Sequence, residues 1–301
     1  MKIKFILMLL CVTVAGLAQT GDELRKSGKL DPAMYAYGKV FFQNPDDAEN
    51  AYKLAATLAL GQMQDTAFYF LKSALKNNHE LMPLADSDFF VMSRDPRWSE
   101  IEREQMRKYQ QKNGPLKDPE YALELLKMIM RDQAMDYYLD QAKAFYGEHG
   151  HAPHWLHPVS YIKGEINKVN YERMMLLLRE KGWPTYSRVG DLAADAPLLV
   201  INHHPDDEVR KQYLPMIREA CLGGEASCVE YAKIHDRVLA NAGEPQDYGM
   251  QFEFRKGVLV PMEIKDPEYV DQRRAEIGLE PLKDYLKRRI DYDFKVAQKK
   301  R

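Results

Sequence analysis

The stretch that decides the fold class is Asp118–Tyr146, DPEYALELLKMIMRDQAMDYYLDQAKAFY, near the middle of a chain of 301 residues. Apolar side chains recur in it every three or four residues, which is the period of an α-helix with one buried face. Asp118 and Pro119 form a typical helix start, because aspartate caps free backbone amides and proline fits the first turn. The spacing predicts one long helix from Pro119 to about Tyr146, and with it a mostly helical protein.

One charged residue, Asp132, falls on the apolar side of that predicted helix. A buried carboxylate is costly unless another group pairs with it. We therefore expect Asp132, with Gln133 beside it, either to be held by an arginine or amide from another helix or to belong to a pocket.

Upstream, residues 31–78 also have helical spacing and contain two partial copies of a unit of about 34 residues, similar to a tetratricopeptide repeat. Small and apolar side chains occupy matching positions, which are Ala33, Tyr37, Val40 and Pro45 in the first copy and Leu54, Ala55, Leu58, Ala67, Leu71 and Ala74 in the second. The segment 44–47 is expected to end one helix and to cap the next through an aspartate. So short an array needs a neighbour to pack on.

The polar segment 110–119 contains Gly114 and Pro115 and is the best domain boundary. We expect a tetratricopeptide-like helical module over residues 19–112 and a second helical domain over residues 113–301. In the second domain the pattern predicts a helix over 165–181. It favours a helix over a strand at 198–202. Alternating apolar and polar residues predict a small antiparallel hairpin near 248–264. The module is interpreted as a docking surface for a protein partner or as a helical cap without one.

The first residues have the basic, hydrophobic and small-residue regions of a signal peptide, which we place at residues 1–18 with cleavage near Ala18 and Gln19. The mature chain is therefore expected outside the cytoplasm, periplasmic or secreted, with no integral membrane segment. It keeps 41 basic and 45 acidic side chains, so its charge does not favour nucleic acid as a partner. Its two cysteines, Cys221 and Cys228, either form a disulfide across a short loop or stay as free thiols.

The richest polar cluster is Leu198–Glu208, LLVINHHPDDE. Its HPDDE segment resembles the motif of zinc-dependent de-N-acetylases. That resemblance implies zinc bound by His204 and Asp207, with His235 as a third ligand. Fewer than 100 residues follow, without the alternating strands and helices that such a sheet requires. The plainer interpretation is that the acidic residues cap a helix that begins after Pro205. No metal site is therefore favoured, and zinc remains an alternative.

Several spaced motifs of the second half resemble a bacterial family, the domain of unknown function 6624, over about residues 119–286. The motifs are Asp132-Gln133, Gly182-Trp-Pro-Thr185, Val189-Gly190, Asn202-His203, Asp236-Arg237, Gln246-x-Tyr248-Gly249-x-Gln251-Phe252 and Val270-Asp-x-Arg-Arg-x-x-x-Gly-Leu-x-Pro281-Leu. The resemblance implies no reaction. On the matching positions it implies one polar group, made of Asp132, Gln133, His203, Asp236, Arg237, Tyr248 and Gln251.

Two functions remain open from the residues. The first is an exported binding or interaction protein with a polar pocket, without a cofactor, whose ligand-binding candidates are Asp132, Gln133, Asn202, Tyr248 and Gln251. The second is a hydrolase, whose catalytic candidates are His203, Asp236 and Arg237. In the second, His203 or His204 would be a base or a metal ligand, an aspartate among Asp206, Asp207 and Asp236 would orient it, and Arg237 would neutralise negative charge.

Overall fold

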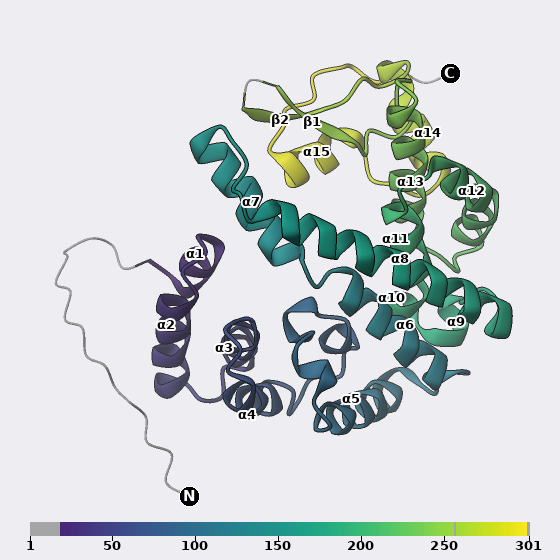
Figure 1. Cartoon of the computed structure of the whole chain (residues 1–301). Helices are drawn as coiled ribbons and strands as arrows, with labels where there is room; N and C mark the ends of the chain where they lie inside the picture. The colour runs from purple at the N-terminus through teal and green to yellow at the C-terminus, as the bar shows by residue number, and fades with distance from the viewer. Residues whose placement is uncertain (1–18, 256, 300–301) are drawn as a thin grey trace, which may run out of the picture.

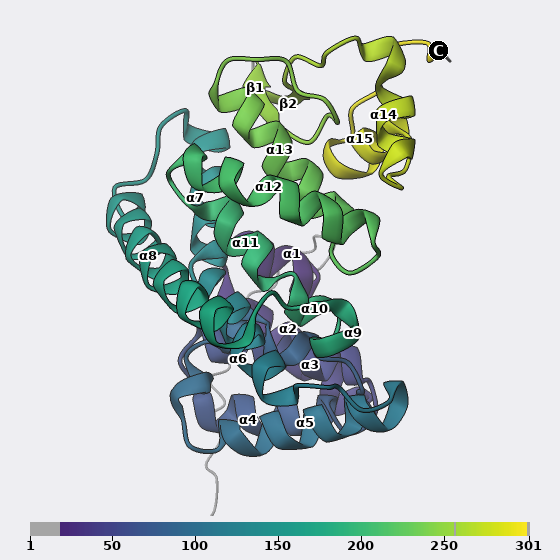
Figure 2. The ribbon, with the colours of Figure 1, turned by 90° about the vertical axis from the view of Figure 1, so that its right-hand side faces the viewer.

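The computed structural model describes residues 19–255 and 257–299, and the predicted signal peptide lies outside this part of the chain. The protein is mostly helical with one two-stranded hairpin, as the sequence predicts. The molecule is elongated. The N-terminal helices occupy one end, and the hairpin with the last helices occupies the other (Figures 1 and 2). Within the described residues, every helix is too short or too polar to span a lipid bilayer.

The N-terminal part is built from short helices that pack as helical hairpins. Ala33, Ala55 and Ala67 are completely buried, and such small side chains allow neighbouring helices to approach closely. Asp47 caps the third helix by accepting a 2.9 Å hydrogen bond from the amide of Asn50, as predicted. Val40, at a predicted apolar repeat position, is instead 42% exposed. The elements are α1 (Gly21–Lys26), α2 (Leu30–Gln43), α3 (Ala48–Leu60), α4 (Gln64–Ala74), the 3₁₀ turns η1 (Met82–Leu84), η2 (Ser87–Phe89) and η3 (Met92–Arg94), and α5 (Trp98–Asn113).

The predicted long helix from Pro119 to Tyr146 is wrong in one respect, because it is broken into α6 (Pro119–Asp132) and α7 (Asp136–His149). The amide of Asp136 bonds to the carbonyl of Gln133, 2.9 Å away, instead of continuing the helix to the carbonyl of Asp132. The ammonium group of Lys163 donates to that freed carbonyl. A distant lysine thus satisfies the carbonyl at the break, and neither glycine nor proline marks the break in the sequence.

Lys163 belongs to α8 (Leu156–Lys181), which begins nine residues before the predicted start at residue 165. Three short helices and two longer ones follow, which are α9 (Tyr186–Val189), α10 (Asp191–Ala194), α11 (Ala196–His203), α12 (Asp207–Leu222) and α13 (Cys228–Asn241). The apolar run 198–202 is helical, as favoured from the sequence. Cys221 and Cys228 form a disulfide that joins the end of α12 to the start of α13.

The predicted hairpin is present, and its strands are β1 (Phe252–Arg255) and β2 (Val258–Pro261). Phe252 pairs with Pro261 at the open end, and Gly257 adopts a φ of +79° in the turn. The chain then forms a 3₁₀ turn and two helices, η4 (Pro267–Tyr269), α14 (Val270–Glu276) and α15 (Leu282–Ile290).

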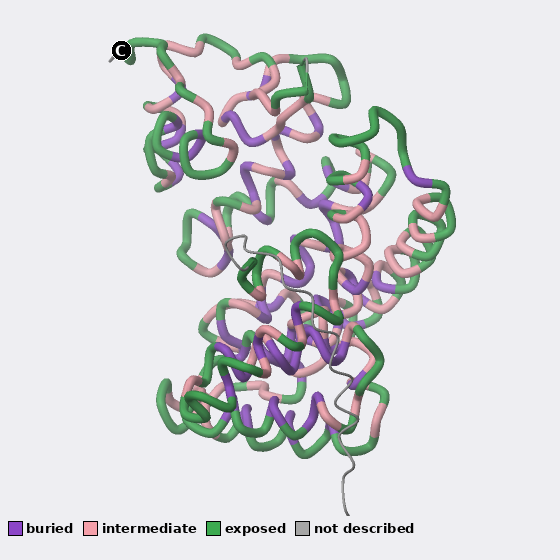
Figure 3. Tube along the Cα trace, turned by 90° about the vertical axis from the view of Figure 1, so that its left-hand side faces the viewer, coloured by how far each residue is buried: buried purple, intermediate pink, exposed green. Residues whose placement is uncertain are grey.

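Buried apolar side chains form one cluster that continues from the N-terminal helices into the C-terminal ones. Figure 3 marks the buried residues in purple along the chain trace. Polar contacts also join the two parts. The Tyr137 hydroxyl of α7 donates to the carbonyl of Arg25 in α1, 3.2 Å away, and Gln141 donates to the carbonyl of Lys26, 3.1 Å away. The N-terminal helices therefore support the C-terminal region from α6 onward, which holds the candidate residues.

Candidate functional site

Asp132 is a completely buried predicted site residue, with a side chain that is 0% exposed. It is the last residue of α6, directly before the break, and its carboxylate contacts residues of α8 and α11. Its Oδ2 atom has two side-chain partners, His203 and Lys163. Asp132 is therefore held by other helices, as expected, but by a histidine and a lysine instead of an arginine or amide.

His203 is the partner of Asp132 that makes this site a candidate for binding or catalysis. It ends α11, because His204 is extended and Pro205 follows. Its Nδ1 atom lies 2.7 Å from Oδ2 of Asp132, and the imidazole side chain is 25% exposed. A carboxylate can only accept, so Nδ1 carries the shared hydrogen. In the neutral ring Nε2 is then the free acceptor.

Lys163 completes what we call the His203 group, consisting of Asp132, Lys163 and His203. The ammonium nitrogen lies 3.3 Å from Oδ2 of Asp132 and 3.3 Å from Oδ1 of Asp136, and the side chain is 13% exposed. Sequence reasoning missed this residue. Lys163 stands in a polar stretch of α8, where a lysine is indistinguishable from a solvated surface residue.

Three buried side-chain oxygen atoms without a donor belong to Asp132 and to two residues that contact or adjoin His203. Oδ1 of Asp132, Oδ1 of Asn167 and Oδ1 of Asn202 are buried and have no hydrogen-bond donor among the described residues. Asn167 donates to the carbonyl of His203 over 3.4 Å, and Asn202 precedes His203 in the chain. Buried acceptors without a donor are rare in proteins, and they favour a site that takes donors from outside the chain.

Arg237 lies beside the His203 group, but its hydrogen bond stabilises the end of α11. Its Nη1 atom donates to the carbonyl of Asn202 over 3.1 Å, and Arg210 donates to the same oxygen over 3.2 and 3.0 Å. The last carbonyls of a helix lack partners within the helix, so both arginines satisfy the end of α11. Burial lowers the pKa of Arg237, and the nearby charge of Arg210 adds to this effect.

Asp236 forms a different arrangement, which we call the Asp236 group. The completely buried carboxylate accepts from the amides of Asp247 (2.9 Å), Tyr248 (3.1 Å to either oxygen) and Met250 (2.9 Å). Burial raises its pKa to about 6, and the three amides act in the opposite direction. Gly249 has a φ of +78°, and a Cβ atom there would lie 2.5 Å from Leu282. Asp236 thus holds a tight loop in place.

Two of the predicted ligand-binding residues, Tyr248 and Gln251, have partners near this loop. Gln251 donates to the carbonyl of Lys233 over 2.9 Å. The Tyr248 ring packs against the rings of His235 and Tyr231, at centroid distances of 5.4 and 6.1 Å, and burial raises its pKa. Gln133 is half-buried at the end of α6, next to Asp132. The structure therefore distributes the predicted residues between two groups instead of one.

The HPDDE segment behaves as a helix cap. Asp206 accepts from the amide of Glu208 over 2.9 Å at the start of α12, and Asp207 pairs with Arg210. The His204 ring packs on Tyr171 at 4.4 Å. Nε2 of His235 lies 2.8 Å from Oδ2 of Asp247, and this contact lowers the pKa of Asp247. In the part of the chain that the structure describes, no three His, Cys, Asp or Glu side chains are grouped so that they could hold a metal ion.

Comparison with known proteins gives a family without a reaction. No curated protein and no solved structure matches the chain. The family whose pattern matches is described only as a family of unknown function, and the match extends beyond the last helix into the C-terminal tail. It includes every member of both the His203 group and the Asp236 group. Through residues 119–297, the chain belongs to the family of unknown function DUF6624.

Proposed function

We propose that this is an exported protein that binds a small polar ligand at the His203 group. The observation that carries the proposal is the contact between a completely buried Asp132 and a partly exposed His203, 2.7 Å apart. Burying a carboxylate between an imidazole and an ammonium group is costly for folding alone, so its retention favours a role in recognition. The ligand would be a molecule with hydroxyl or amide groups, which can donate to the unpartnered oxygens and contact His203.

Export is supported by the signal-like first residues and by the disulfide between Cys221 and Cys228, since such bonds persist in oxidising compartments. In this proposal residues 19–112 form a tetratricopeptide-like module that docks on a protein partner, and residues 113–301 form the ligand-binding domain. The exposed side chains of Tyr35 (76%) and Phe42 (68%) on α2 support a docking role, because exposed aromatic residues are favoured at interfaces.

Binding can be tested by saturation-transfer NMR with glucose, glycerol, glycinamide and acetate as probes. We expect at least one probe to receive saturation from the wild-type protein and to lose most of it in the His203→Gln variant. His157→Gln, which changes an exposed histidine on α8, is the matched control and should leave the signal unchanged. Equal signals from wild-type and His203→Gln protein for every probe would remove His203 from ligand binding.

A second candidate function, hydrolysis, is favoured by the same atoms in a more specific way. A carboxylate that holds Nδ1–H leaves Nε2 as a proton acceptor, as in the histidine–aspartate pairs of hydrolases. Nε2 of His203 would take a proton from water, the hydroxide would attack an ester or amide carbonyl, and the same proton would then pass to the leaving group. The orienting carboxylate would be Asp132, not the three aspartates considered from the sequence.

Hydrolysis can be tested with p-nitrophenyl acetate, a reactive ester that reports weak general-base activity. We expect His203→Ala to lower the protein-dependent rate constant about 100-fold, which is typical of losing a general base, and added imidazole to restore part of it. His157→Ala is again the control. An unchanged rate in His203→Ala, or no hydrolysis above buffer by the wild-type protein, would leave ligand binding as the function.

A further inference from the structure

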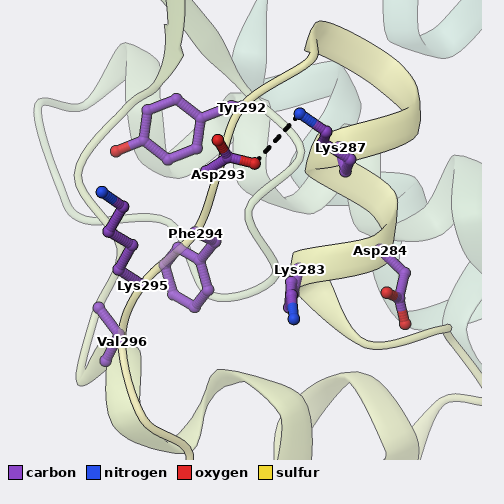
Figure 4. A pocket seen from close by; sticks show the side chains of 8 residues that line it. All are labelled: Lys283, Asp284, Lys287, Tyr292, Asp293, Phe294, Lys295 and Val296. Carbon is purple, nitrogen blue, oxygen red and sulfur yellow. Dashed lines mark ion pairs between the residues drawn. The ribbon is translucent and has the colours of Figure 1, made fainter.

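A pocket of about 640 Å³ lies at the far end of the C-terminal region, between α15 and the tail that follows it (Figure 4). None of the site residues predicted from the sequence lines it. Its walls are formed by Lys283, Asp284, Lys287, Tyr292, Asp293, Phe294, Lys295 and Val296. The family match ends at residue 297 and so includes the tail residues that line the pocket.

The tail is held against the rest of the protein although it forms neither helix nor strand. Asp291 has a φ of +51° and turns the chain back at the end of α15. Tyr292 and Phe294 are half-buried against the apolar core. Further on, Gln298 accepts from the amide of Asp271 over 3.0 Å and donates to the carbonyl of Pro267 over 2.9 Å. The tail wall of the pocket is therefore anchored on both sides of its lining residues.

The charges in the pocket are unevenly compensated. Lys287 is paired with Asp291 and Asp293, at 2.5 and 3.1 Å. Lys283 and Lys295 have no carboxylate within 4.0 Å among residues 19–255 and 257–299. Figure 4 shows these two lysines on opposite sides of the Phe294 ring. The lining as a whole carries three ammonium groups against two carboxylates, so an anion would find unpaired positive charge there.

We propose that this pocket binds a small organic anion that carries an aromatic or aliphatic group. The carboxylate or phosphate of the ligand would interact with Lys283 and Lys295, and its apolar part would lie on Phe294 and Tyr292. The volume lies within the range of about 300–1,000 Å³ that is usual for small-molecule sites. This site is separate from the His203 group, so either proposal can fail without the other.

The test is a calorimetric or NMR titration of the full mature chain with phenyl phosphate, benzoate and the neutral benzyl alcohol. Both ammonium groups are exposed, so we expect saturable binding of the anions with a Kd on the order of 1 mM that weakens with added salt. Tighter binding of phenyl phosphate would indicate a phosphate ligand, and tighter binding of benzoate a carboxylate. Benzyl alcohol is expected not to bind.

Substitutions of the lining residues test whether the anions bind in this pocket. The double variant Lys283→Gln and Lys295→Gln should weaken anion binding at least tenfold, whereas Lys168→Gln, an exposed lysine of α8 outside the pocket, should not change it. Phe294→Leu keeps apolar packing but removes the ring, and it should weaken binding of the aromatic anions without unfolding the protein. The inference is overturned if the wild-type protein shows no saturable binding, or if the double variant binds as tightly as the wild type.

Discussion

Asp132 and Asp236 are both completely buried carboxylates of the same region, yet they are satisfied in opposite ways. Asp236 accepts from three backbone amides, which have fixed positions and do not titrate. Asp132 instead contacts the side chains of His203 and Lys163 through Oδ2, and its Oδ1 atom has no donor among the described residues. An aspartate bound to amides stabilises a loop. An aspartate bound to an imidazole also controls where that imidazole holds its proton.

The largest expected effect concerns the Asp236 group. Asp236→Ala would leave the buried amide of Met250 and the partly buried amides of Asp247 and Tyr248 without their acceptor. We expect a loss of about 4 kcal/mol in the free energy of unfolding, because each unsatisfied amide costs about 1–3 kcal/mol and the loop relaxes in part. Urea unfolding followed by circular dichroism measures this loss. A loss below about 1 kcal/mol would show that the loop is held by other contacts.

A third carboxylate, that of Asp195, extends the comparison because its pKa makes the free energy of unfolding depend on pH. Burial raises its pKa to about 6, although Tyr186 and the amide of Ser227 donate to it. Between about pH 4 and 6 the folded state keeps a proton that the unfolded chain has released. The contribution of Asp195 to the free energy of unfolding should therefore fall as the pH rises through this window.

Asp195→Asn removes that titration and keeps Oδ1, the atom that accepts both hydrogen bonds. The stability of the wild-type protein relative to this variant should therefore fall by about 2 kcal/mol between pH 4 and pH 6, and should stay constant above about pH 7. Urea unfolding of both proteins at several pH values checks this. A difference independent of pH would mean that Asp195 ionises in the folded protein as it does in the unfolded one.

The smallest expected effect on stability, about 1 kcal/mol, is that of Asp132→Asn. The asparagine can still accept from His203, and Lys163 keeps Asp136 and the carbonyl of residue 132 as partners. The substitution should instead change which ring nitrogen of His203 carries the hydrogen. NMR of the ring nitrogens of His203 should show the hydrogen on Nδ1 in the wild-type protein and a mixture of tautomers in the variant. If this variant is destabilised as strongly as Asp236→Ala, both aspartates are structural and the contrast between them disappears.

Much of the local structure could be predicted from the sequence. Asp47 and Asp206 cap helices where expected, the run at 198–202 is helical, and the hairpin is present. Each of these features depends on residues that are a few positions apart, so the local sequence pattern is sufficient to predict it. Asp132 and His203, which contact each other in the structure, also stand out in the sequence, one as a charged group on an apolar stripe and the other as a histidine after an apolar run.

Their arrangement could not be predicted in the same way. The resemblance to the family implies a single polar group, but the structure places the predicted residues in two groups. Asp236 and Arg237 are neighbours in the sequence, but one accepts from a loop and the other donates to the end of α11. Adjacent residues on a helix point about 100° apart, so a shared motif does not imply a shared site.

The sequence by itself determined that this protein is helical with one hairpin and that Asp47, Asp118 and Asp206 begin helices, because these properties follow from short-range periodicity, caps and turns. Its spaced motifs also indicated the family of unknown function. Only the tertiary structure decided that α6 ends at Asp132, that Lys163 takes the carbonyl freed there, and that His203 meets a carboxylate 71 residues earlier in the chain. Those contacts join different helices, and they form only when packing brings the helices together.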